Sequence, residues 1–274
     1  MKFKDKYLDL NRPHVMGILN VTPDSFSDGG RYAKIEDALA HARKMLAEGA
    51  SIIDVGGEST RPGAEQVSEQ DELDRVIPVI ERINAELDTI ISIDTSKPVV
   101  MSHAISAGAA MINDVSALQM NDALSMAASL EVPVCVMHMQ GEPQTMQQSP
   151  TYQNVVDEVA EFLLARCDAC IGAGISSDQI MIDPGFGFGK TVQQNIEIMQ
   201  KLDSFVSGKY PVLLGISRKS TIGAILDRPI EERLAGSLAL TALAVNAGVK
   251  IIRAHDIKAS MDTINITFAI KNRA

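Results

Sequence analysis

The sequence predicts an α/β protein built as a single-domain (β/α)8 barrel, the TIM barrel. Eight short segments rich in Val, Ile and Leu alternate with helical patterns along the 274 residues. Barrels of this kind commonly have about 250 residues. Neither a linker nor a shift in composition divides the chain. We therefore predict one domain over residues 1–274.

The expected strands are almost continuously apolar, which is typical of parallel strands that helices cover. They span residues 14–20, 51–56, 90–96, 111–116, 132–139, 180–185, 211–217 and 251–256. The expected helices span residues 36–48, 71–87, 98–107, 122–130, 152–172, 192–202, 231–247 and 258–270. Gly49 follows the first of these helices, where glycine is a common C-terminal signal.

An open, doubly wound sheet is the alternative arrangement of these elements. That fold often has a G-x-G-x-x-G turn after its first strand. Here the first strand runs into residues 20–30, NVTPDSFSDGG, which lack the pattern. Taken alone, this stretch has the composition of a surface loop, although the aromatic Phe26 is unusual in an ordinary connection. The closed barrel is the preferred prediction.

The charge of the chain limits the classes of partner. The formal net charge is −10, which argues against a surface for nucleic acid or anionic membranes. No apolar segment reaches the roughly 20 residues of a membrane span, and residues 1–14 lack the apolar centre of a signal peptide. We expect a cytoplasmic protein with no nucleic-acid or membrane partner.

Two of the three cysteines, Cys167 and Cys170, form a C-x-x-C pattern. Such a pair can indicate redox or metal chemistry. Both thiols, however, share a helical apolar stripe with Leu163 and Ile171. We therefore interpret them as core residues.

Polar side chains stand at seven of the eight expected strand ends. They are Asn20, Asp54, Asp94, Asn113, Asp114, Asp183, Ser217, Arg218, Lys219, Arg253 and His255, and the fifth strand provides Met137 and His138. One acid at one strand end would more often be a helix cap or a turn former. The repetition instead predicts a site at the carboxyl end of the barrel, where such enzymes carry their chemistry.

The residue types at these ends indicate two kinds of ligand. Carboxylates and amides suit a flat heterocycle with an amino-pyrimidinone edge, because one carboxylate can accept from two adjacent donors. Arg253 and His255 suit a phosphate or diphosphate. Asn20 lies on the first strand, which neighbours the last strand in a closed barrel. We therefore expect a heterocycle pocket beside an anion pocket.

Three other patterns indicate different chemistry. Residues 183–191, DPGFGFGKT, end like a P-loop, but Pro184 replaces the first glycine that a P-loop requires. Lys219 could form a Schiff base as in aldolases, although a lysine near carboxylates is more simply a hydrogen-bonding cation. The five histidines lack zinc-ligand spacing. Magnesium remains compatible, because it needs few protein oxygens.

Taken together and in order, seven motifs resemble the dihydropteroate synthase family. They are residues 20–30, 49–64 (GASIIDVGGESTRPGA), 91–98 (ISIDTSKP), 112–118 (INDVSAL), 182–190 (IDPGFGFGK), 215–220 (GISRKS) and 253–256 (RAHD). The resemblance covers nearly the whole barrel. It implies a folate-pathway transferase that joins p-aminobenzoate to 6-hydroxymethyl-7,8-dihydropterin diphosphate, giving 7,8-dihydropteroate and pyrophosphate. It also implies a Mg²⁺ requirement, inhibition by sulfonamides and a homodimer.

The resemblance also implies roles for individual residues. The pterin set is Asp94, Asn113, Met137, Asp183, Phe188 and Lys219. The diphosphate set is Asn20, Arg253 and His255, with Asn20 acting through the metal. The p-aminobenzoate set is Phe26, Thr60, Arg61, Pro62, Ser217, Lys219 and Ser220.

In this family, departure of the diphosphate would leave a pterin methylene cation that the arylamine then attacks. The resemblance implies that Asp28 helps to stabilise that cation, and that Lys219, Arg253 and His255 take part in catalysis. Closure of the first two loops would keep water from the cation. We therefore expect the part of the first loop that carries Phe26 and Asp28 to be poorly ordered without both substrates.

Two rival functions share parts of this pattern. A pterin-binding methyltransferase module of the corrinoid type would share the barrel and the pterin acids, but would not need Asn20, Arg253 and His255. A Schiff-base aldolase would use Lys219. A non-catalytic relative is a third alternative, although every expected residue is present.

Overall fold

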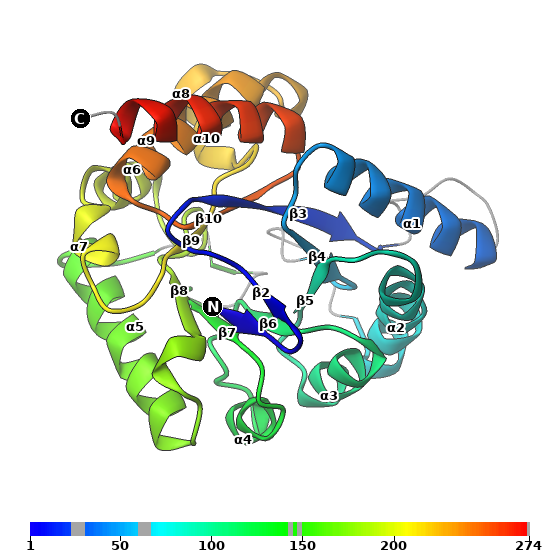
Figure 1. The fold of residues 1–274 in the computed structure, drawn as a ribbon. Coiled ribbons are helices and arrows are strands. Elements are labelled where there is room, and N and C mark those ends of the chain that lie inside the picture. The colour runs from blue at the N-terminus through cyan, green and yellow to red at the C-terminus, as the bar shows by residue number, and fades with distance from the viewer. Residues whose placement is uncertain (23–30, 60–66, 142–144, 147–149, 273–274) are drawn as a thin grey trace.

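The computed structural model describes residues 1–22, 31–59, 67–141, 145–146 and 150–272, without the side chains of residues 31–33. These residues form the predicted (β/α)8 barrel, with helices in a ring around the strands (Figure 1). The order of its parallel strands is β8-β7-β6-β5-β4-β3-β10-β9. A single parallel bridge between Ile182 and Val212 joins β8 to β9. The alternative of an open, doubly wound sheet is therefore wrong.

The barrel strands are those predicted, and most are shorter than expected. They are β3 (His14–Asn20), β4 (Ile52–Gly56), β5 (Ile90–Asp94), β6 (Met111–Asp114), β7 (Val134–Met137), β8 (Ile180–Asp183), β9 (Leu213–Gly215) and β10 (Ile251–Ala254). Only β3 keeps its full predicted length. β4 begins one residue later than predicted and ends at Gly56 as expected, whereas the other six end early. After such an end the backbone turns away from the ladder and bonds to side chains; the N–H of Lys97, for example, donates to Thr95 Oγ1 at 3.2 Å.

Each predicted helix is also present. They are α1 (Arg31–Ala47), α2 (Glu69–Glu86), α3 (Pro98–Ala107), α4 (Ala123–Ser129), α5 (Val155–Gly172), α6 (Val192–Gln200), α9 (Leu234–Ala247) and α10 (Ile257–Lys271). The structure adds two helices that we did not predict, α7 (Asp203–Val206) and α8 (Ser220–Leu226). The four residues of α7 are too few for a helical period to emerge from the sequence. α8 begins directly after the GISRKS motif, whose residues we interpreted as part of the site.

Alternation along the strands separates the interior of the barrel from its outer wall. Val15, Ile53, Ile91 and Ile252 belong to the large core between strands and helices. The adjacent strand residues point to the other side and form a second core inside the barrel. With their counterparts on the other strands, they are Met16, Ile52, Ile90, Met111, Cys135, Met181, Leu213 and Ile251. The barrel is therefore filled by side chains.

The core interpretation of the C-x-x-C pattern is confirmed. Cys167 and Cys170 are fully buried on α5 and form no disulfide. The prediction for Ile171 was wrong, because its side chain is 42% exposed. The buried stripe of α5 begins at Val155 and continues through Val159, and Ile171 lies at its edge.

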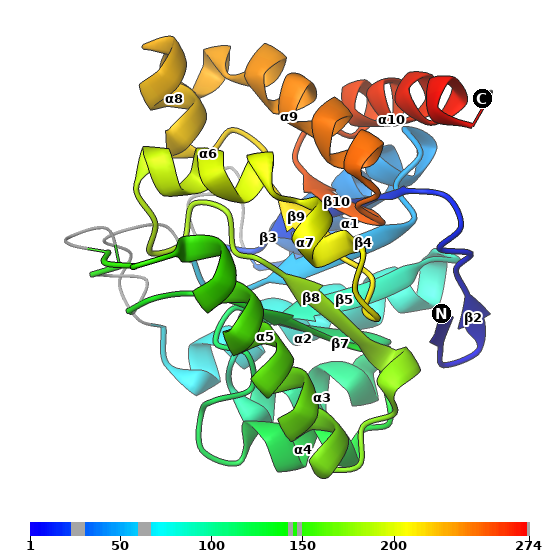
Figure 2. The same ribbon diagram turned by 90° about the vertical axis from the view of Figure 1, so that its left-hand side faces the viewer.

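An N-terminal hairpin closes one end of the barrel, which the sequence did not reveal. It consists of β1 (Lys2–Phe3) and β2 (Lys6–Tyr7), and Figure 2 shows it at one end of the molecule beside the N-terminus. Phe3 is fully buried against the apolar residues at the start of the strands. The carboxyl ends of the strands are therefore left for the site.

Among the described residues, no helix has the length and apolarity required to cross a bilayer.

Candidate active site

A cavity of about 700 Å³ lies at the carboxyl end of the strands. Residues from β3, β5 and β10 and from the segments after β4, β8 and β9 meet in it. Those predicted for the site are Asn20, Asp94, Phe188, Ser217, Lys219, Ser220, Arg253 and His255. The cavity thus combines members of the predicted pterin, diphosphate and p-aminobenzoate sets.

Strand periodicity explains why these polar residues converge. Asp54, Asn113, Asp183 and Arg253 each stand two residues after a member of the inner apolar core. Because side chains alternate along a strand, residues two positions apart share a face. The same parallel strands therefore carry an apolar layer and then a polar layer towards their carboxyl ends.

Arg253 is the centre of the polar layer. Its Nε donates to Asp54 Oδ2 at 2.6 Å, and its Nη2 donates to Asp94 Oδ2 at 2.7 Å. Asn113 Nδ2 donates to the same oxygen of Asp54 at 3.1 Å. Asp54 is fully buried, and its Oδ1 has no hydrogen-bond partner among the described residues. Strands β4, β5, β6 and β10 are thus tied together by side chains.

Burial and neighbouring charges shift the pKa values of Asp94 and Arg253 in opposite directions. Burial raises the pKa of Asp94 to about 7, although Arg253 acts in the opposite direction. Burial alone would lower the pKa of Arg253, but Asp54 and Asp94 outweigh it and raise that pKa. Arg253 therefore stays charged and holds the two carboxylates together.

Lys219 provides a second cation, after β9. Its Nζ donates to the carbonyl oxygen of Phe186 and lies 3.9 Å from the centre of the Phe188 ring. Burial lowers the pKa of Lys219 to about 7, although Asp183 acts to raise it. A lysine of this kind can change its charge near neutral pH and can donate to a ligand.

Three of the predicted pterin residues are buried on neighbouring strands and do not line the cavity. Asn113, Met137 and Asp183 are 4%, 3% and 6% exposed. Asn113 pairs in register with Asp94, and Met137 pairs with Asp183. Asp183 Oδ1 accepts from the N–H of Gly185 at 2.7 Å. The pKa of Asp183 is raised above its usual value, because the effect of burial exceeds the opposing effect of the Lys219 charge.

His255 and Ser217 are held together on one side of the cavity. Ser217 Oγ lies 3.0 Å from His255 Nδ1 and accepts from the N–H of His255 at 3.2 Å. His255 is exposed, and Ser217 is buried. The predicted diphosphate residue His255 is therefore oriented by a residue predicted for the p-aminobenzoate set.

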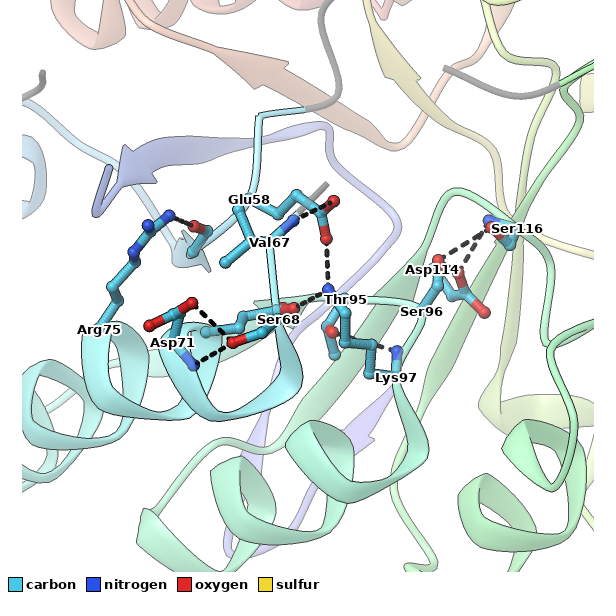
Figure 3. A network of polar contacts seen from close by, with 12 residues as sticks. Glu58, Val67, Ser68, Asp71, Arg75, Thr95, Ser96, Lys97, Asp114 and Ser116 are labelled. Atoms are coloured by element: carbon cyan, nitrogen blue, oxygen red, sulfur yellow. Dashed lines mark hydrogen bonds and ion pairs between the residues drawn. The ribbon is translucent and has the colours of Figure 1, made fainter. Parts of the chain in front are cut away.

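A polar network connects the segments at the ends of β4, β5 and β6 (Figure 3). Lys97 binds the carboxylates of Glu58 and Glu72, and Glu58 Oε1 accepts from the N–H of Val67 at 3.2 Å. Ser96 donates to Asp114. Because Glu58 also lines the cavity, this network fixes one wall of the site.

Several predicted residues lie outside the described part of the chain. They are Phe26, Asp28, Thr60, Arg61 and Pro62, and the expected poor order of the loop that carries Phe26 and Asp28 also concerns residues outside that part. These predictions stay predictions.

The sequence analysis gave no role to several residues at the cavity. Asp54 was recognised at a strand end, and its period-two relation to Ile52 is a signal that could have marked it. Asp54 is fully buried and is not among the residues that line the cavity, whereas Thr22, Glu58, Arg218 and Arg233 are. Of these four, only Arg218 was recognised at a strand end. Arg233 follows a 3-10 turn (Ile230–Glu232), where no strand pattern marks it.

The residues described at the cavity are compatible with a magnesium ion that takes few of its ligands from the protein. Within the described ranges, no three His, Cys, Asp or Glu side chains are grouped in a way that could hold a metal ion. Asn20, whose side chain carries an amide oxygen, lines the cavity. Magnesium commonly takes one or two protein oxygens and completes its shell with phosphate and water. This donor set therefore fits an ion that arrives with a diphosphate.

Comparisons with known proteins agree with this geometry. Residues 16–255 match the family model of pterin binding enzymes. The chain is 52% identical over 268 residues to the dihydropteroate synthase of Haemophilus influenzae, covering 98% of both chains.

Two solved structures have the same fold. The first is the Yersinia pestis dihydropteroate synthase in complex with a sulfonamide drug, which has a TM-score of 0.94 and 46% identity and covers 99% of this chain and 98% of that one. The second is the Xanthomonas albilineans dihydropteroate synthase with 4-aminobenzoic acid, which has a TM-score of 0.91 and 47% identity and covers 97% of this chain and 95% of that one.

Proposed function

We infer the function of this chain from its family: it belongs to the pterin binding enzymes and, among them, to the dihydropteroate synthases. It is a transferase that joins 6-hydroxymethyl-7,8-dihydropterin diphosphate to p-aminobenzoate and releases pyrophosphate. The observation that carries this function is the cavity in which Asp94, Arg253 and Lys219 meet. The rival corrinoid-type methyltransferase is not favoured, because the relatives are synthases over nearly their full length.

In this proposal the buried acids of the polar layer form the inner end of the pterin pocket, beneath the part of the cavity that Asp94 and Lys219 line. A carboxylate such as Asp183 can accept from two adjacent N–H groups of the pterin ring. Asn113 supplies both a donor and an acceptor, and the Lys219 ammonium supplies a further donor. The ring of Phe188, which already lies under a cation, packs against the flat heterocycle.

Arg253 and His255 hold the diphosphate. Arg253 carries a permanent charge, and His255 is exposed at the cavity beside it. Both can donate to the leaving oxygens as their negative charge grows, which lowers the barrier to departure. The bond from the pterin methylene to oxygen breaks first, and the pterin ring stabilises the resulting cation.

Magnesium is proposed as the cofactor, with Asn20 as its protein ligand. When bound, it would neutralise charge on the diphosphate. This chain's residues would orient the substrate around it: Asn20 from β3 and Arg253 from β10 lie on paired strands.

The p-aminobenzoate occupies the outer part of the cavity, near Ser217, Lys219 and Ser220. Its amine attacks the methylene and then loses a proton. An arylamine is already neutral near pH 7, so that the attack needs no strong base. Sulfonamides compete for this position, in keeping with the relative that was solved with one.

A homodimer is the proposed assembly. Leu243 on α9 and Ile266 and Ile270 on α10 are 59%, 66% and 72% exposed, and a second copy would cover these apolar side chains. Sedimentation would show a monomer for Leu243→Glu and a dimer for the control Leu164→Glu on α5.

Three buried free thiols suit a reducing compartment such as the cytoplasm, which is the proposed location.

The decisive assay mixes the protein, Mg²⁺ and pterin diphosphate with and without p-aminobenzoate, and follows pteroate and pyrophosphate. We expect pteroate only when both substrates are present. No pteroate under any condition would refute the function. Borohydride trapping with a keto substrate tests the Schiff-base alternative, and labelling of Lys219 would support an aldolase.

The order of bond making is tested with substituted p-aminobenzoates. If the diphosphate leaves first, electron-withdrawing substituents that weaken the amine should change kcat little. A steep dependence of kcat on amine basicity would instead show that attack by the amine limits the rate.

A further inference from the structure

Residues 183–191 end like a P-loop but lack its first glycine. Their lysine, Lys190, has no part in the function proposed above. Lys190 is only 2% exposed, and the residues that line the cavity do not include it. Burying a cation is costly unless it is well hydrogen-bonded. A lysine in this position therefore calls for a physical explanation.

The Nζ of Lys190 is surrounded by acceptors from two segments. It donates to the carbonyl oxygens of Gly185 at 2.9 Å and Phe188 at 3.0 Å. It also lies 2.9 Å from His138 Nδ1 and 3.3 Å from the His138 carbonyl oxygen. Burial, followed by the charge of Lys190, lowers the pKa of His138 to about 3, so that the imidazole is neutral and Nδ1 can accept. The ammonium thus joins the end of β7 to the segment after β8.

Other side chains hold the rest of residues 185–189, here called the glycine loop. Tyr152 donates its hydroxyl to the carbonyl oxygen of Gly189 at 2.7 Å. Asn195 accepts from the N–H of Gly187 at 2.7 Å. Backbone groups that usually bond within a helix or sheet are therefore held here by specific side chains.

The glycine loop also lies too close to its neighbours for larger residues. A Cβ on Gly185 would stand 1.8 Å from the carbonyl oxygen of His138, and one on Gly187 would stand 2.7 Å from Lys219 Cδ. Both glycines have positive φ, 68° and 83°, which other residues rarely adopt. The loop is therefore packed between His138 on one side and Lys219 on the other.

We propose that Lys190 is the positioning residue of the pterin pocket. It holds the glycine loop so that the carbonyl oxygen of Phe186 and the ring of Phe188 meet Lys219 in the correct place. Lys190 itself touches no substrate and acts through these groups. The proposal rests on the proposed function, because it takes the cavity beside Phe188 and Lys219 to be the pterin pocket.

The test compares Lys190→Met with Lys4→Met. Lys4 is a matched control, because its Nζ also donates to a carbonyl oxygen, that of Ile105 at 2.6 Å, at the other end of the barrel. The dissociation constant of 6-hydroxymethyl-7,8-dihydropterin is measured by calorimetry at a temperature at which both variants are folded. Hydrogen exchange is followed in a peptide that covers residues 184–190.

We expect Lys190→Met to weaken pterin binding at least tenfold and to speed exchange in that peptide. Lys4→Met should stay within twofold of the wild type in both measurements. The KM for p-aminobenzoate should change less than the pterin dissociation constant, whereas a general loss of structure would move both. A folded Lys190→Met protein with wild-type pterin affinity would overturn the proposal.

A milder variant covers the case in which Lys190→Met does not fold. Tyr152→Phe removes only the hydroxyl that binds Gly189, and we expect pterin binding about threefold weaker. Wild-type affinity in that folded variant would count against a positioned glycine loop. If the wild-type protein itself bound no pterin, the proposed function would fail, and hydrogen exchange would still show whether Lys190 holds the loop.

Discussion

Arg253 Nη2 lies 2.7 Å from Asp94 Oδ2, so that a residue predicted for the diphosphate is paired with one predicted for the pterin. An ion pair therefore connects the two expected pockets. Arg253 also binds Asp54. The side chain that we propose for the leaving group thus also bonds to two buried acids of the polar layer, which we propose for the heterocycle pocket.

The first prediction concerns Arg253→Gln. It leaves Asp54 and Asp94 buried without a compensating charge, and removal of one partner of a buried pair typically costs about 3–5 kcal/mol. Denaturant unfolding should show a loss of this size, and activity should fall below detection. The control Arg228→Gln removes an exposed pair with Glu232 and should change the unfolding free energy by less than about 1 kcal/mol. Equal losses in both variants would contradict the central role of Arg253.

The second prediction concerns Asp183→Ala. Loss of a charge-assisted partner should weaken pterin binding by about 2–5 kcal/mol, which calorimetry can measure. Asp88→Ala is the control, because Asp88 is an exposed partner of Lys6 far from the cavity. Near-normal pterin affinity in Asp183→Ala would show that the pocket is misassigned.

The third prediction concerns pH and His138. An unfolded histidine has a pKa near 6.5, whereas the folded pKa of His138 is about 3. Between these values the unfolded state binds more protons, so that stability falls as the pH falls from about 6.5 towards 3. His138 is fully stabilising only above this range. Its contribution to the slope is at most on the order of 1.4 kcal/mol per pH unit.

Denaturant unfolding between pH 4 and pH 7 measures this slope. The folded variant His138→Gln should show a shallower dependence than the wild type. His103→Gln replaces an exposed histidine and should keep the wild-type slope. Identical slopes in all three proteins would exclude a buried neutral His138.

The fourth prediction concerns the N-terminal hairpin. Phe3 is fully buried in the inner core, and truncation of such a side chain costs about 3–5 kcal/mol. Phe3→Ala should therefore lower the unfolding free energy by this amount. Tyr7→Ala removes a side chain that is 73% exposed in the same hairpin and should cost less than about 1 kcal/mol. A stable Phe3→Ala protein would mean that the barrel does not need its hairpin.

The sequence by itself determined the barrel and the strands that build it. Near-continuous apolar strands with helices between them leave few arrangements, and parallel strands bring their carboxyl ends to one edge. Asn20, Asp94 and Arg253 could therefore be placed at one site before any contact was known. The hairpin of β1 and β2 escaped prediction because its strands have two residues each, too few for a pattern.

Only the tertiary structure decided which of these residues pair. Arg253 and Asp94 are 159 positions apart in the chain, and the closed barrel brings them within hydrogen-bond distance. The hydrogen bonds of Lys190 could not be predicted from the sequence either. Its partners are His138 and backbone carbonyl oxygens, and every residue has a carbonyl oxygen. Local patterns report which face a side chain occupies, whereas its partners depend on how strands from distant parts of the chain close around one core.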